Sequence, residues 1–257
     1  MVSWNPNQYL KFANERSRPC LDLIQRLLLD SPERIIDLGC GPGNSTTALA
    51  RRWPNAQITG LDSSADMIAA ARGVNPNQRW IQSDIATWTA VEPYDLIFSN
   101  AALQWVADHA KVFPQLLNQV GRHGALAVQM PANHDDSPGH RLMHDLAEST
   151  EWKPLFTRDP DLCRVHNLSF YYNILTPAAT RLDLWRTDYI HILAGPEDIV
   201  EWYKGTGLRP YLEALPTSAD RYRFVAAYGH LIARAYPRQS DGRVLFPFPR
   251  LFLIAYR

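Results

Sequence analysis

Residues 37–44 read Asp-Leu-Gly-Cys-Gly-Pro-Gly-Asn, and this stretch decides the fold. It places glycines at positions 39, 41 and 43 directly after Ile35 and Ile36. Glycine has no Cβ, so the backbone there can take positive φ and approach a ligand closely, while the first amides of a following helix remain free to bind an anion. The pattern predicts a strand, a tight turn and a helix that together hold a cofactor.

Asn44 separates this loop from the dinucleotide fingerprint G-x-G-x-x-G, which requires a glycine at that position. That third glycine lets the helix and strand of an NAD-binding fold pack tightly, and asparagine adds a side chain there. An NAD-linked oxidoreductase therefore stays an alternative that Asn44 disfavours. A cofactor-binding protein without catalysis is a second alternative.

Further strands follow the glycine loop at spacings typical of a doubly wound sheet. We predict them at 57–62, 80–85, 94–100 and 124–130. The first of these strands ends in Asp62, a carboxylate placed to accept hydrogen bonds from two ribose hydroxyls. Taken alone, Asp62 before Ser63 and Ser64 is equally well explained as the cap of the next helix.

The motif D-x-G-x-G-x-G, followed by acids after the second and third strands, resembles the class I S-adenosylmethionine-dependent methyltransferases. The resemblance implies an α/β fold: a seven-stranded Rossmann-like sheet flanked by helices, with helical cap insertions after strands five and six. It implies S-adenosylmethionine as cofactor, with Asp84 near the adenine amino group and Ile85 beside the ring. The full set of implied cofactor residues is Asp37, Gly39, Gly41, Gly43, Asn44, Asp62, Ser63, Asp84, Ile85, Asn100, Ala101 and Trp105.

The length of 257 residues and the 46% hydrophobic content allow one large core without disulfides or metal. We expect a single methyltransferase domain over 1–257, with insertions at about 134–164 and 196–242. The remaining predicted elements are helices at 138–150 and 168–175, a helical region at 196–236, and strands at 181–192 and 250–256. The segment 4–19 is expected to precede the first core helix as a flap over the cofactor.

The three cysteines, Cys20, Cys40 and Cys163, are odd in number and widely scattered. They give no disulfide framework and favour a reducing compartment, so we expect a cytoplasmic protein. The N-terminus lacks the basic head and apolar core of a signal peptide, and no run of about 18 apolar residues predicts a membrane segment.

Nucleic acid is an unsuitable partner for this chain. The 26 basic and 26 acidic residues cancel, which removes the electrostatic attraction that supplies most non-specific nucleic-acid affinity. Base-modifying amino methyltransferases carry an Asn/Asp-Pro-Pro-aromatic motif after strand four, whereas residues 100–103 read Asn-Ala-Ala-Leu. The aromatic clamp for a flipped base is therefore missing.

The resemblance also covers the terminal and cap segments, where it implies methyl transfer to a carboxylate of a small tricarboxylic acid. A carboxylate, with an ordinary pKa near 4, is already ionised at neutral pH, so the reaction needs no general base. We therefore expect no catalytic residue beyond groups that orient the reactants. A methyltransferase acting on another small acceptor, such as a quinone precursor or an amine, shares the cofactor motifs and stays an alternative.

Arginine is the residue best suited to such an acid, because its planar fork matches a carboxylate. We rank Arg209 and Arg16 highest. Arg209 follows a turn in which Gly207 is expected to free the backbone. Weaker candidates are Arg18, Tyr171, Trp202 and Lys204, and the competing interpretations are solvated arginines and core aromatics, Trp105 included. The predicted acceptor-binding set is Tyr9, Arg16, Gln104, Trp105, His134, Tyr172 and Arg209.

His140 and His144 lie four residues apart, as in the zinc motif H-E-x-x-H, but Arg141 stands where that motif has its glutamate. We predict no metal site. Cys40 lies inside the glycine loop without a histidine positioned by sequence to activate it, which makes it a small packing residue rather than a nucleophile.

Overall fold

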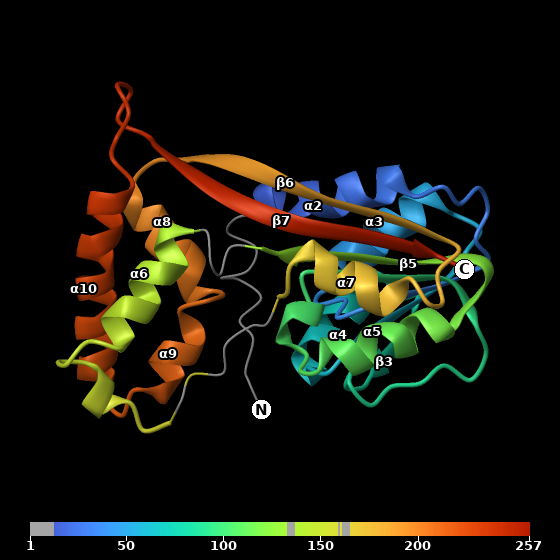
Figure 1. Ribbon diagram of the computed structural model, residues 1–257, viewed down its shortest axis with the longest axis horizontal. Coiled ribbons are helices and arrows are strands. Elements are labelled where there is room, and N and C mark those ends of the chain that lie inside the picture. The colour runs from blue at the N-terminus through green and yellow to red at the C-terminus, as the bar shows by residue number, and fades with distance from the viewer. Residues whose placement is uncertain (1–12, 133–136, 159, 161–164) are drawn as a thin grey trace. The chain divides into compact units, whose positions relative to one another are not determined.

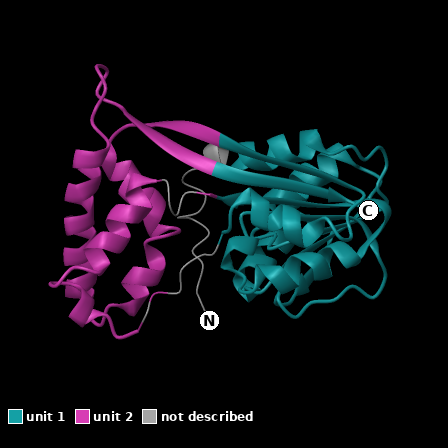
Figure 2. Ribbon diagram, viewed as in Figure 1, with its two compact units in different colours: residues 1–131, 164–187, 250–257 teal, residues 132–163, 188–249 magenta. Residues whose placement is uncertain are grey.

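The computed structural model describes residues 13–132, 137–158, 160 and 165–257, with side chains in the first range from residue 17 onward. The chain forms two compact units (Figure 2). Unit 1 comprises residues 1–131, 164–187 and 250–257, and unit 2 comprises residues 132–163 and 188–249. The second unit covers most of the two regions where the sequence predicts insertions, together with the adjoining parts of β6 and β7. That the whole chain is one domain with two insertions stays a proposal.

Unit 1 is built on a seven-stranded sheet with the order β3-β2-β1-β4-β5-β7-β6. Neighbouring strands from β3 to β5 are parallel, and β7 is antiparallel to β5. The expected sheet of a class I methyltransferase is confirmed. The strands are β1 (Arg34–Leu38), β2 (Gln57–Asp62), β3 (Arg79–Gln82), β4 (Tyr94–Asn100), β5 (Val120–Pro131), β6 (Arg181–Leu193) and β7 (Val244–Tyr256).

The strand order reverses at β1, because β2 lies on one side of it and β4 on the other. In open parallel sheets, ligands bind beyond the carboxyl ends of the strands at such a reversal. The glycine loop follows β1 at this point. The apolar residues that support it, including Ile35, Ile97 and Phe98, are fully buried in the middle of the sheet.

Helices cover both faces of the sheet in unit 1, with α2 and α3 on one side and α5 and α7 on the other (Figure 1). The helical elements of this unit are α2 (Ala13–Arg26), α3 (Asn44–Arg52), α4 (Ala65–Val74), the 3₁₀ turn η1 (Leu103–Trp105), α5 (His109–Asn118) and α7 (Leu168–Leu175). The flap predicted at 4–19 is wrong from Ala13 onward, since these residues form the first turns of α2. Residues 4–12 lie outside the described part of the chain.

Several element boundaries differ from the sequence prediction. The third strand ends at Gln82, two residues before Asp84, because the Asp84 carboxylate accepts a hydrogen bond from the Ala86 amide and its carbonyl accepts from the amides of Thr87 and Trp88. This turn lifts the chain off the sheet.

Strand β5 begins at Val120 and β7 at Val244, both earlier than the sequence predicts. Periodicity does not locate these ends. Val120 pairs with Tyr94 of β4 across a register shift, and β7 continues to Val244 beyond its pairing with β5, which ends at Arg250.

Unit 2 is a helical cluster joined to the outer parts of β6 and β7. Its helices are α6 (Pro138–Ala147), α8 (Pro196–Lys204), α9 (Arg209–Ala214) and α10 (Ser218–Ala235), with the 3₁₀ turn η2 (Lys153–Leu155). Buried aromatic side chains fill its centre, among them Trp202, Tyr203, Tyr228 and Phe246. The helical region predicted at 196–236 is thus three helices, and the predicted helix 138–150 ends at Ala147.

In the part of the chain that the structure describes, no helix is both long and apolar enough to cross a membrane.

Candidate functional site

The three glycines of the loop after β1 all have left-handed backbone conformations, with φ of 70° at Gly39, 54° at Gly41 and 92° at Gly43. An L-residue with a side chain is strained there. A Cβ on Gly39 would lie 2.1 Å from the Cβ of Ala102, so this glycine is required for the close approach of the segment after β4. A Cβ on Gly41 would meet nothing within 4 Å. Gly41 thus exposes backbone to open space, as a ligand-binding loop requires.

Asp37 holds this loop from below. It is fully buried, and its Oδ2 accepts hydrogen bonds from the hydroxyls of Ser45 at 2.6 Å and Thr46 at 2.7 Å. The N-cap of α3 is Gly43, which has no side chain to cap the helix, so Asp37 binds the first turn from the end of β1 instead. Burial raises the pKa of Asp37 to about 6, against the opposing effect of the two hydroxyls. Its predicted role in cofactor binding stays a prediction, and its described hydrogen bonds are to α3.

Asp62, at the end of β2, binds the glycine loop through its carboxylate. One carboxylate oxygen accepts a hydrogen bond from the Gly41 amide and the other from the Ser64 amide, each at 2.9 Å. The N-cap of α4 is Ser64, whose hydroxyl accepts from the Met67 amide, so helix capping belongs to Ser64. Each oxygen of Asp62 keeps a lone pair. The half-buried carboxylate can therefore still accept hydrogen bonds from ribose hydroxyls.

The remaining cofactor candidates of the first three strands lie around this loop. The Ile85 Cδ1 atom lies 3.6 Å from the position of a Cβ built on Gly39, which places it beside the loop. Asp84, Ser63 and Asn44 are exposed. Their contact with a cofactor stays a prediction.

The segment after β4 comes to the same edge. Ala101 has φ of 56°, which costs roughly 1–3 kcal/mol in a residue other than glycine. Its amide donates to the Gln129 carbonyl at 2.9 Å, and its carbonyl accepts from the Gln104 side chain at 2.8 Å. Strand β4, η1 and β5 are thereby joined through one residue, and the predicted residues Asn100, Ala101 and Gln104 are brought together. Trp105 ends η1 and is half-buried.

Gln129, which has no exposed surface, is not among the site residues predicted from the sequence. Among the described residues, neither its side-chain oxygen nor its nitrogen has a hydrogen-bond partner, and the same holds for the buried oxygens of Asn100 and Gln104. The sequence signal that could have identified Gln129 is its polar side chain within the otherwise apolar run 124–130.

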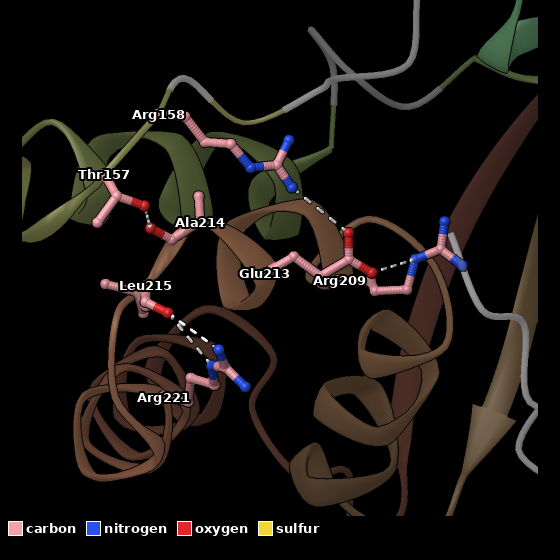
Figure 3. A network of polar contacts seen from close by, with 7 residues as sticks. All are labelled: Thr157, Arg158, Arg209, Glu213, Ala214, Leu215 and Arg221. Atoms are coloured by element: carbon pink, nitrogen blue, oxygen red, sulfur yellow. Dashed lines mark hydrogen bonds and ion pairs between the residues drawn. The ribbon is translucent and has the colours of Figure 1, made fainter. Parts of the chain in front are cut away.

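Arg209, the leading acceptor candidate, lies in a network of polar contacts in unit 2 (Figure 3). Its side chain is 17% exposed, and its Nε lies 3.5 Å from Oε1 of Glu213, whose other oxygen lies 3.7 Å from Arg158. Burial lowers the pKa of Arg209, and the charge of Glu213 opposes this shift. One carboxylate thus faces two guanidinium groups.

The prediction that Gly207 frees the backbone of the turn before Arg209 is wrong. Its φ is not positive, and a Cβ there would lie 2.8 Å from the Nε2 atom of His140. Close packing against His140 therefore excludes a side chain at this position, rather than a need for backbone freedom.

The other acceptor candidates are less favourably placed or lie outside the described residues. Tyr9, His134 and the side chain of Arg16 belong to the latter group. Tyr172 is 51% exposed on α7, and Arg18 is exposed on α2. Trp202 packs in the core of unit 2, and Lys204 forms an ion pair with Glu201 at 2.6 Å.

The neighbouring Tyr171 has a structural role. Its ring is fully buried, and its hydroxyl is held by the ring of His109 at 2.8 Å and by the His166 amide at 3.1 Å.

Cys40 is a packing residue, as predicted. It lies in a buried cluster with Ile68, Ala71 and Trp80, and burial raises the pKa of its thiol, which keeps it protonated. His140 packs its ring edge-on against Tyr203 at 4.8 Å between centroids.

Comparison with known proteins gives one family. The methyltransferase domain matches residues 29–172. Trans-aconitate 2-methyltransferase of Azoarcus sp. (strain BH72) is 46% identical over 257 residues, which is 100% of both chains. The enzyme of the same name from Methylobacterium nodulans is 48% identical over 258 residues, covering 100% of this chain and 99% of that one.

Solved structures of low identity share the fold. The YcgJ protein of Bacillus subtilis has a TM-score of 0.63 at 16% identity, with 93% of this chain and 98% of that chain covered. Phosphoethanolamine N-methyltransferase 2 of Haemonchus contortus, solved in complex with S-adenosyl-L-methionine, has a TM-score of 0.54 at 16% identity, with 93% and 52% covered.

Replacing Asp37 with asparagine tests the buried carboxylate below the loop. Because the folded protein raises this pKa from 3.8 to about 6, the contribution of Asp37 to stability is complete below pH ~4 and is lost as the pH rises through ~6. The asparagine side chain does not titrate. The free energy of unfolding of Asp37→Asn minus that of the wild type should therefore increase between pH 4 and 7, by about 3 kcal/mol.

Urea denaturation at a series of pH values measures this difference. The control is Asp66→Asn, which removes an exposed carboxylate from the first turn of α4 and should give a small change over the same range. A difference for Asp37→Asn that is independent of pH would contradict the assignment.

Proposed function

Because this chain belongs to the methyltransferase-domain family, and within it to the trans-aconitate 2-methyltransferases, we propose that it transfers the methyl group of S-adenosylmethionine to a carboxylate of trans-aconitate. The products are a monomethyl ester and S-adenosylhomocysteine. The observation that carries the proposal is identity of 46% and 48% to enzymes of that name over the whole chain. Segments 103–105, 128–131 and 247–252 carry the same resemblance in the sequence.

The loop after β1 fits the cofactor. The open space at Gly41 admits a ligand against the backbone, and Asp62 beside it supplies carboxylate oxygens for the ribose hydroxyls. Ile85 offers an apolar side chain for the adenine ring, and Asp84 an acceptor for its amino group. When bound, S-adenosylmethionine supplies a methyl group made electrophilic by the sulfonium.

The protein's part in the reaction is orientation. The accepting carboxylate is ionised at neutral pH and attacks without a general base. The residues of the site must align its oxygen with the methyl carbon and the sulfur, and exclude water. Alignment of this kind is worth roughly 7–11 kcal/mol. Arg209, held by Glu213 in unit 2, is the proposed partner of a second carboxylate of the substrate.

A small-molecule acceptor and a cytoplasmic location belong to the same proposal. The formal net charge of +0 supports a partner other than nucleic acid. Cys20 and Cys40 are buried free thiols, which supports a reducing compartment.

Methyl transfer from labelled S-adenosylmethionine to trans-aconitate, cis-aconitate, citrate and isocitrate tests the function. We expect a labelled monomethyl ester with trans-aconitate as the preferred acceptor. Calorimetric titration should show binding of S-adenosylmethionine and none of NADH. Binding of the cofactor without transfer to any of these acids would overturn the assigned acceptor.

Gly41→Ala should abolish cofactor binding while the protein stays folded, because the new methyl group occupies the open space beside the loop. Gly242→Ala is a matched control, since Gly242 also has positive φ, 82°, and open space around its Cβ position. Both variants should lose about 1–2 kcal/mol of stability through backbone strain. Calorimetry and thermal unfolding separate the effects, and equal cofactor affinity in the two variants would make the loop purely structural.

Asp62→Ala should weaken S-adenosylmethionine binding by about 1.5–3 kcal/mol, about 10- to 150-fold, through the loss of hydrogen bonds to a charged group. Asp66→Ala removes an exposed carboxylate of the neighbouring helix and should bind normally. Calorimetric dissociation constants of the two variants decide the matter. Wild-type affinity in a folded Asp62→Ala protein removes Asp62 from the site.

Arg209→Ala should raise the KM for trans-aconitate tenfold or more, because a charge-assisted hydrogen bond is worth about 1.5–3 kcal/mol. Arg209→Lys should recover part of this loss, since a point charge cannot reproduce the bidentate fork. Arg223→Ala is the control, as Arg223 is an exposed arginine of the same unit that pairs with Glu151. Steady-state kinetics with an ordinary KM for Arg209→Ala would exclude this arginine from the acceptor site.

A further inference from the structure

A side-chain amide that has no hydrogen-bond partner in the described part of the chain lies buried near the carboxyl end of β5, at the edge of the sheet that carries the proposed site. Gln129 is 0% exposed, and neither atom of its carboxamide has a hydrogen-bond partner among the described residues. Burying a polar group without a hydrogen-bond partner is unfavourable, because the group loses its bonds to water. Leucine or methionine would fill the same place without that cost, so the amide serves something other than the stability of the fold.

Strand register fixes the direction of the side chain. Gln129 pairs with Asn100 of β4 and with Phe252 of β7. Side chains at paired positions of neighbouring strands lie on the same face. Two residues earlier, Phe98 of β4 pairs with Asp37 of β1, whose carboxylate faces α3. Since residues two apart share a face, Asn100 and Gln129 both face the side of the sheet that α3 covers.

The neighbours of Gln129 along this edge belong to the proposed site. Its backbone carbonyl accepts the amide of Ala101, and the side chain of Gln104 donates to the carbonyl of Ala101. The side-chain oxygens of Asn100 and Gln104 are also buried without a partner within the described chain. Three residues whose carboxamides have unused hydrogen-bonding capacity are thus neighbours of Ala101, which is held at positive φ: Asn100 in sequence, and Gln104 and Gln129 through hydrogen bonds.

We propose that Gln129 binds the carboxylate that receives the methyl group, by donating a hydrogen bond from Nε2 to its non-reacting oxygen. This inference rests on the proposed function. The loop after β1 and the end of β4 are the cofactor side of the edge, and β5 is the next strand outward. We therefore expect the acceptor, which must lie beside the methyl group of the cofactor, to bind at the carboxyl end of β5.

The chemistry of the reaction favours a neutral donor at this place. An arginine would set a positive charge beside the sulfonium and would hold the attacking carboxylate in a tight ion pair, which lowers its nucleophilicity. A carboxamide holds the oxygen without either effect. Its own oxygen, with that of Asn100, presents a negative dipole to the electron-poor methyl group. The arginines are then left to bind the carboxylates that do not react.

Gln129→Met, which keeps the length of the side chain and removes its hydrogen bonds, tests the assignment. We expect the KM for trans-aconitate to rise tenfold or more, with the dissociation constant of S-adenosylmethionine within threefold of the wild type. The melting temperature of the unliganded variant should equal or exceed that of the wild type, because an unsatisfied amide is removed. Gln129→Glu, which replaces the donor with a negative charge, should raise the KM a hundredfold or more.

Ser99→Ala is the control for loss of a buried polar group. Ser99 is fully buried in β4, one residue before Asn100. Its hydroxyl donates a hydrogen bond to the Leu38 carbonyl at 3.0 Å. This variant should lose stability and keep the wild-type KM. If Gln129→Met also loses stability and keeps the wild-type KM, the amide is structural and the proposal is overturned.

Three further outcomes can be told apart. If the wild type methylates trans-aconitate and Gln129→Met does so with the same KM, the assignment of Gln129 fails and the function stands. If the wild type binds S-adenosylmethionine and methylates no tricarboxylic acid, the proposed function fails, and the carboxylate role of Gln129 with it. If Gln129→Met weakens S-adenosylmethionine binding by the same factor as it raises the KM for trans-aconitate, Gln129 contacts the cofactor. That result would overturn its proposed role in binding the acceptor.

Discussion

The buried carboxylate of Asp37 is the interaction on which the site depends. It binds two hydroxyls in the first turn of α3 and so fixes the end of β1 to the start of that helix across the three glycines. The glycines permit the tight path of the loop, and their freedom is also a liability, since nothing in their side chains selects one conformation. Asp37 from below and Asp62 from the side supply that selection.

The conformation of the glycine loop depends on the carboxylates of Asp37 and Asp62 as well as on its glycines. Each acid lies at the end of a parallel strand, so the sheet sets the distance between them. A buried charge close to a second charge is unfavourable, and the pKa of Asp37 is raised accordingly, chiefly by burial. The fold tolerates this cost at the point where the backbone must be held for a ligand. Stability is given up locally, and the large apolar core of the sheet offsets it.

Much of the fold could be predicted from the sequence because its signals are local. The glycine loop, the acid after β2 and the apolar strand runs are short patterns with direct conformational meaning. The boundary of β3 was missed, since the turn at Asp84 depends on one side-chain hydrogen bond. The starts of β5 and β7 were missed, since Val120 pairs with Tyr94 of β4 across a register shift, and β7 continues beyond its pairing with β5, which ends at Arg250.

The site followed the same division. Motifs locate Asp62, Gly41 and Ala101 at this edge of the sheet, where their contact with a cofactor stays a prediction. Gln129 lies in an apolar run and reads as an interruption of it until its strand partner is known. Gly207 shows the opposite error. The residue was noticed but the predicted reason for it was wrong, because the ring that excludes a side chain in this turn belongs to His140 of α6, far away in sequence. Sequence identifies which residues are unusual, and packing decides why.

The left-handed backbone of Ala101 has a consequence for how such enzymes diversify. This residue fixes the chain where β4, η1 and β5 meet, through hydrogen bonds made by its own amide and carbonyl. The directions of the neighbouring side chains are therefore set by the main chain and not by one another. Gln104 contributes its side chain to this junction, whereas Gln129 contributes only its backbone carbonyl. Under the proposed role of Gln129, the side chain at position 129 can therefore change, and with it the acceptor, while the cofactor loop is left undisturbed. A scaffold of this kind can acquire new substrates by few substitutions.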